Sequence, residues 1–164
     1  MKNQVRMLGG LTSAALLAPA MLIAPAAEAL PPVMISQIVY DSFGATKDDY
    51  SNRSLNAEYV VLKNTTSRTQ TVTGWTLRDK TGFTYRLPAT TIPAKGSIRI
   101  FTGKGTNTNA KGSTTPGKRY WGKTSYVWNN TGDTATLRNK AGKSMDSCTY
   151  RDKSTKDNIK SVAC

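Results

Sequence analysis

The feature that most constrains the fold of this sequence is an alternation of apolar and polar residues with a period of two. In the stretch 56–79, Val60 and Leu62 are two positions apart, and so are Trp75 and Leu77. Alternate side chains of an extended chain lie on one face, so each pair points to the same side of a strand. No segment has the spacing of an amphipathic helix. The sequence therefore predicts a chain of β-strands with Trp75 at the centre of the core.

The predicted strands are short and are separated by turn-forming residues roughly every eight to twelve positions. They cover residues 33–40, 58–63, 75–78, 83–87, 97–102, 134–139 and 143–150. The segments 75–78 and 83–87 are predicted to form a hairpin in which Phe83, Tyr85 and Leu87 point inward. Strands so spaced, with no helices between them, indicate an all-β antiparallel sandwich or barrel.

The first 29 residues have the composition of a secretory signal. Lys2 and Arg6 give a positive start, residues 11–23 an apolar middle, and Ala27-Glu28-Ala29 a cleavage site with small residues. Pro19 and Pro25 interrupt the apolar run, which is therefore shorter than the roughly 20 residues that a membrane-spanning helix needs. Cleavage is therefore predicted after Ala29, with an uncleaved membrane anchor as the alternative.

This assignment predicts the organisation of the chain. Residues 1–29 are the signal peptide, residues 30–150 a single β-sandwich domain, and residues 151–164 a C-terminal tail. The protein is expected to be secreted and extracellular, with no membrane span after the signal is removed.

The charge of the chain is strongly positive. Of the formal net charge of +13, Lys2, Arg6 and Glu28 contribute +1, so residues 30–164 carry +12. Such a charge attracts polyanions at long range, and salt weakens the attraction. Outside a cell, these include teichoic acid, nucleic acid, anionic polysaccharide and lipid headgroups. In the alternative interpretation, the charge serves only solubility.

The two cysteines, Cys148 and Cys164, both lie in the predicted exported part, where thiols can pair. Their pairing would fasten the tail 151–164 to the last strand and contribute about 3 kcal/mol of stability. An intermolecular bridge and two free thiols are the alternatives. The spacing does not resemble a metal site, because there is no second cysteine pair and no histidine.

Catalysis is not expected from this sequence. Without histidine, a serine or cysteine nucleophile lacks its usual base, and no motif supplies another. The one candidate cation site is the acidic loop 41–58, whose oxygen ligands for calcium would be Asp41, Asp49, Asn52 and Glu58. The alternative is that these side chains cap turns. A metal-dependent hydrolase centred on Asp41, Asp49 and Glu58 is a further hypothesis.

Basic and aromatic residues form the second candidate site. Outward positions of the predicted strands and the following loop supply cations, and aromatic residues lie nearby, as in surfaces that bind single-stranded nucleic acid or sugar. The candidate residues are Arg78, Arg86, Arg99, Arg138, Lys104, Arg119, Trp121 and Trp128. Alternatively, the aromatic residues complete the core and the cations are merely solvated.

Four separate motifs carry a resemblance to a known family. They read EYVVLKN at 58–64, GWTLRD at 74–79, TGKG at 102–105, and VWNN followed by GDTATL at 127–137. Their order and spacing are similar to those of the lamin tail domain family in its bacterial secreted form, over residues 33–150. The resemblance implies an immunoglobulin-like β-sandwich and does not imply an activity. In nuclear lamins, the related domain is an interaction module for proteins and DNA.

We therefore expect a secreted, non-enzymatic binding or adhesion module that associates with anionic extracellular polymers, either cell wall polymer or nucleic acid. A structural domain whose partner is an extracellular protein is the first alternative. A metal-dependent hydrolase or calcium-binding module that uses the loop 41–58 is the second.

Overall fold

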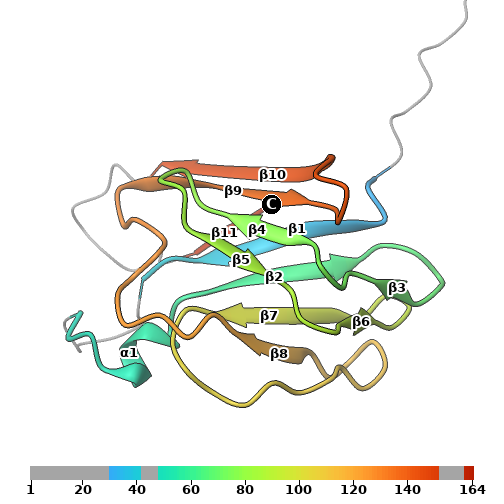
Figure 1. Cartoon of the computed structure of the whole chain (residues 1–164), viewed down its shortest axis with the longest axis horizontal. Coiled ribbons are helices and arrows are strands. Elements are labelled where there is room, and N and C mark those ends of the chain that lie inside the picture. The colour runs from blue at the N-terminus through green and yellow to red at the C-terminus, as the bar shows by residue number, and fades with distance from the viewer. Residues whose placement is uncertain (1–29, 42–47, 152–160) are drawn as a thin grey trace, which may run out of the picture.

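A computed structural model of the chain describes residues 30–41, 48–151 and 161–164 (Figure 1). The predicted signal peptide, part of the acidic loop and most of the predicted tail lie outside these residues. The described elements are one short helix and eleven strands. They are β1 (Val33–Val39), α1 (Asn52–Leu55), β2 (Tyr59–Asn64), β3 (Gln70–Thr71), β4 (Thr76–Arg78), β5 (Thr84–Arg86), β6 (Thr91–Ile92), β7 (Ser97–Phe101), β8 (Gly117–Tyr120), β9 (Gly132–Arg138), β10 (Ser144–Arg151) and β11 (Ser161–Ala163).

The strands form two main sheets that pack face to face (Figure 1). One sheet has the order β11-β1-β2-β7-β8 and the other the order β10-β9-β4-β5, while β3 and β6 form a small ribbon. Neighbouring strands are antiparallel except β7 and β8, which are parallel. The predicted antiparallel β-sandwich is thus confirmed, with one parallel pair at the edge.

The core lies between the two sheets and consists of the residues that the alternation predicts. Val60 and Leu62 of β2 are fully buried, as are Leu77 of β4 and Leu137 of β9. Their strand neighbours of opposite parity are only half-buried or exposed. Burial of one face of each sheet therefore fixes the register, because a one-residue shift would turn every core side chain outward.

Trp75 does not occupy the centre of the core, so that prediction is wrong. It precedes β4 in a turn where its backbone N–H donates to the Val72 carbonyl at 3.1 Å, and it is only half-buried against the core. The central tryptophan is Trp128, which is 1% exposed. The predicted hairpin of β4 and β5 is present, but Phe83 lies in its turn and is 41% exposed rather than inward.

A disulfide joins the two sheets at one edge. Cys148 of β10 pairs with Cys164, which follows β11, and their Cα atoms are 5.8 Å apart. β11 lies against β1 as the edge strand of the other sheet. The predicted pairing is confirmed, and the bond links β10 to a strand outside its own sheet. In the parts of the chain described by the structure, no helix has the length and apolar character needed to cross a bilayer.

Candidate functional site

The outer face of the sheet β10-β9-β4-β5 carries alternating arginine and hydroxyl side chains. In one row across the strands, Thr76 of β4 lies between Arg86 of β5 and Arg138 of β9. In the next row, Arg78 of β4 lies between Thr84 and Thr136. Each arginine therefore has threonine neighbours along its strand or across the sheet.

We call this surface the Arg/Thr face. Its members are Thr76, Arg78, Thr84, Arg86, Thr134, Thr136, Arg138, Ser147 and Thr149. Within the described strands of this sheet, no outward position holds an acidic residue. The carboxylates of Asp79 and Asp133 are buried at its end, and Asp146, opposite the inward Leu137, accepts from the backbone N–H groups of Ile35 and Ser147. An anion on the face would meet cations and hydroxyl groups without a competing carboxylate.

Backbone carbonyls hold the guanidinium groups of Arg86 and Arg138 on this face. Arg86 Nη1 donates to the Gly74 carbonyl at 3.0 Å, and Arg138 Nη1 donates to the Gly142 carbonyl at 3.1 Å. Each arginine has five N–H donors, so these bonds leave most of them for a ligand. A guanidinium already held in place loses less conformational entropy when it binds an anion.

The fourth predicted arginine lies on the other side of the molecule. Arg99 belongs to β7 in the opposite sheet, and its guanidinium carbon is 5.4 Å from the centre of the Tyr59 ring. Lys104 is exposed in the loop after β7. The structure therefore brings together Arg78, Arg86 and Arg138 but not Arg99, which corrects the predicted stripe of four arginines.

Arg119 is not a surface residue, because it points into the molecule from β8 and is 2% exposed. Its Nε donates to Thr90 Oγ1 at 2.8 Å, and its Nη1 donates to the carbonyls of Thr108 and Lys118. Burial lowers the pKa of this guanidinium. Arg119 thus fastens the loop between β7 and β8 and is unavailable to a ligand.

The predicted aromatic members of the site belong to the core. Trp128 is buried, and Trp121 packs against it with the ring centroids 6.2 Å apart. Trp121 is half-buried and also contacts the ring of Tyr85. The prediction that Trp121 and Trp128 form a binding surface is therefore corrected to a packing role for both.

The sequence was compared with models of known protein families and with curated proteins. The sequence matches the Lamin Tail Domain family over residues 26–152. The chain belongs to this family. Lamin tail domains are immunoglobulin-like domains of protein interaction and are generally non-enzymatic. No match was found among curated proteins.

In this lamin tail domain, the acidic side chain of Glu58 does not point to the predicted cation site. Glu58 is fully buried, and its carboxylate accepts hydrogen bonds from the backbone N–H groups of Val127 and Trp128. Burial raises the pKa of Glu58 to about 7, although these N–H groups and the Thr102 hydroxyl oppose the shift. Glu58 therefore fastens the segment that carries Trp128 and is not available as the predicted metal ligand.

The other predicted cation ligands bond to the chain around them. Asp49 Oδ1 accepts from the Ser51 N–H at 2.8 Å, and hydrogen bonds from Ser51 lower the pKa of Asp49. Asn52 Oδ1 accepts from the Lys104 N–H, and Asp41 follows β1. Among the described residues, no three His, Cys, Asp or Glu side chains gather as a metal site. For Asp49, the structure matches the turn-capping alternative, whereas Asn52 bonds the distant loop at Lys104.

Proposed function

We propose that this lamin tail domain is a non-enzymatic module that binds anionic extracellular polymers through its Arg/Thr face. The observation that supports the proposal is the outward row pattern of β4, β5 and β9. It presents Arg78, Arg86 and Arg138 among threonines and holds no acid. The formal charge of +12 on residues 30–164 adds a long-range attraction.

The dimensions of this face suit a polymer better than a small anion. Arg86 and Arg138 lie on either side of β4, so their Cα atoms are separated by about 10 Å, twice the spacing of neighbouring strands. Each guanidinium can bind a phosphate or carboxylate through two parallel hydrogen bonds. A chain with repeated anionic groups can therefore contact several arginines at once, whereas a single anion contacts one.

The predicted signal peptide decides which polymers the face would meet. Export would place the domain among cell wall polymers and extracellular nucleic acid, and both teichoic acid and nucleic acid carry phosphodiester groups. A protein partner is the second candidate, which the interaction role of the family favours. In that case, the arginines would remain solvated and the contact would depend little on salt.

Binding is expected to weaken when the three arginines of the face are replaced together. We expect R78A/R86A/R138A to bind purified cell wall and single-stranded DNA at least about tenfold more weakly, since each surface cation contributes about 1 kcal/mol. The matched control is R99A/K111A/K118A, which removes the same charge from exposed positions outside the face. Retention on both materials across a salt series measures the effect.

Two outcomes would count against this proposal. The first is no retention on either material at low salt. The second is an equal loss of binding in the two triple variants, which would attribute binding to net charge alone. A stoichiometric partner recovered from culture supernatant, with retention that does not change with salt, would instead support the protein-binding alternative.

A further inference from the structure

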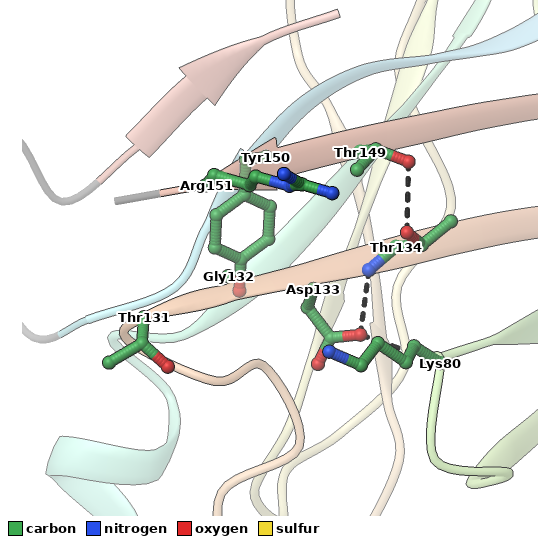
Figure 2. A pocket seen from close by; sticks show the side chains of 8 residues that line it. All are labelled: Lys80, Thr131, Gly132, Asp133, Thr134, Thr149, Tyr150 and Arg151. Carbon is green, nitrogen blue, oxygen red and sulfur yellow. Dashed lines mark hydrogen bonds between the residues drawn. The ribbon is translucent and has the colours of Figure 1, made fainter. Parts of the chain in front are cut away.

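The Arg/Thr face ends in a cleft of about 410 Å³, at the start of β9 and the end of β10 (Figure 2). Thr134 and Thr149 line it and are outward neighbours in the sheet, so the cleft continues the face rather than opening elsewhere. Lys80, in the turn after β4, and Arg151, at the end of β10, complete its charged lining.

The space in the cleft depends on a glycine. Gly132 is the cross-strand partner of Arg151, and its φ of +140° belongs to the region that favours glycine. A Cβ atom at this position would lie 2.9 Å from the Tyr150 carbonyl oxygen and 3.2 Å from the Arg151 Cα atom. With no side chain opposite Arg151, the end of the sheet remains open.

Cations and hydroxyl groups reach the cleft from different elements. Figure 2 shows Arg151 and Thr149 on one strand, Thr134 next to Thr149 on the neighbouring strand, and Lys80 extending from the turn after β4 on the Asp133 side. The two threonine Oγ1 atoms are 2.8 Å apart and share one hydrogen bond. One hydroxyl hydrogen of this pair is therefore free to be donated to a ligand. Thr131 adds a further exposed hydroxyl.

The acidic residue of the cleft lining, Asp133, is occupied by bonds within the chain. Its Oδ1 accepts from the backbone N–H groups of Lys80 at 3.0 Å and Thr134 at 2.7 Å. Its Oδ2 accepts from the backbone and side-chain N–H groups of Asn129. Asp133 is 2% exposed. Its carboxylate therefore positions the backbone of Lys80 and has its lone pairs occupied by four N–H donors, while the side chains of Lys80 and Arg151 line the cleft.

We propose that this cleft binds a phosphate group of the polymer that lies along the Arg/Thr face. The inference rests on the proposed function, because the cleft forms the end of that face. A phosphodiester group of such a polymer has two non-bridging oxygens that share its charge, and each can accept hydrogen bonds from a cation or a hydroxyl of the cleft. The remaining volume accommodates the groups next to the phosphate.

Titration with inorganic phosphate at constant ionic strength tests the cleft by itself. In ¹H–¹⁵N NMR spectra of the full exported chain, we expect saturable shifts at the amides of Lys80, Gly132, Thr134 and Arg151. K80A/R151A should weaken this binding at least about tenfold. The matched control K111A/K118A removes the same charge from exposed positions outside the cleft and should leave the binding unchanged.

A second variant keeps the test valid if K80A/R151A is unstable. T134V/T149V removes both hydroxyls and no charge, and it should weaken phosphate binding while the melting temperature stays near that of the parent protein. Shifts that do not saturate, or that spread evenly over exposed lysines, would overturn the inference. So would shifts of the same size with sulfate, because the site would then recognise any tetrahedral anion.

Retention on single-stranded DNA separates failure of the cleft from failure of the proposed function. If R78A/R86A/R138A loses retention and K80A/R151A behaves like K111A/K118A, the face binds polymer and the cleft inference is wrong. If phosphate saturates the cleft but all variants are retained on DNA equally, the proposed function is wrong. The inference is supported if K80A/R151A loses both phosphate binding and DNA retention while its control K111A/K118A keeps both.

Discussion

Replacing Trp128 with alanine is expected to lower the free energy of unfolding by about 3–5 kcal/mol. Trp128 is 1% exposed and is among the largest fully buried side chains of the described chain. Its removal leaves a cavity in the core that the sheets cannot close, because the remaining buried side chains keep them apart. Denaturation by guanidinium chloride, followed by far-ultraviolet circular dichroism, measures the change.

The comparison variant is Trp75→Ala, at the position that the sequence pattern places in the core. Trp75 is half-buried beside the turn that precedes β4, so its loss should cost only about 1–2 kcal/mol. Both variants remove the same indole group and differ in burial. An equal loss of stability in the two would contradict the placement of Trp128 as the central tryptophan.

The alternation in the sequence predicts most of the core because both sheets bury one face. Val60, Leu62 and Leu77 lie inside, as their spacing requires. Trp75 has the same spacing from Leu77 but lies in the turn before β4, and the two-residue rule applies only within a strand. The position of Trp128 follows from a long-range contact of its backbone with Glu58, which local spacing does not reveal.

The same limit applies to the Arg/Thr face. Arg78 and Arg86 could be predicted as neighbours, because they occupy outward positions of one hairpin, whereas Arg138 joins them only through the long-range pairing of β9 with β4. Arg99 has the same outward character, but its strand joins the other sheet, and strand order depends on pairings between distant segments. Arg119 was missed as a buried residue because its carbonyl partners come from loops that no periodicity describes.

The phosphate cleft combines features that are separately ordinary in the sequence. Gly132 and Asp133 have the composition of a turn, and Lys80 also belongs to a turn. Only the register of β9 with β10 places Gly132 opposite Arg151, and only the bond from the Lys80 N–H to Asp133 brings that turn to the cleft. The sequence Gly132-Asp133 is a recognisable turn signal, but its partners Lys80 and Arg151 can be identified only in the folded structure.

The stability of the domain is expected to fall by about 3 kcal/mol as the pH rises from about 4.5 to about 7, because Glu58 changes its charge in the interior. The pKa of Glu58 is raised from 4.5 to about 7, mainly by burial. Between these values, the unfolded chain has released the proton and the folded chain still holds it. Folding therefore takes up a proton, and the stability gained from protonated Glu58 is complete below this range and lost above it.

Glu58→Gln should remove most of this pH dependence, because glutamine stays neutral and keeps one oxygen to accept from Val127 and Trp128. Free energies of unfolding at pH 5 and pH 8, for the parent and the variant, measure the difference. The lowered pKa of Asp49 has the opposite sign and acts below its ordinary value of 3.8, outside this range. A parent protein with equal stability at the two pH values would contradict the assignment.

Glu58 and Trp128 should also depend on each other, because the Glu58 carboxylate accepts from the backbone N–H of Trp128. At pH 5, the effects of Glu58→Gln and Trp128→Ala on the free energy of unfolding should add within about 0.5 kcal/mol if the two sites act independently. We expect the double variant to lose less free energy of unfolding than the sum of the two single losses. With alanine at position 128, the hydrogen bond from Glu58 no longer places a large side chain in the core, so weakening that bond costs less. Strict additivity would indicate that the buried carboxylate supports the backbone alone and has no part in seating Trp128.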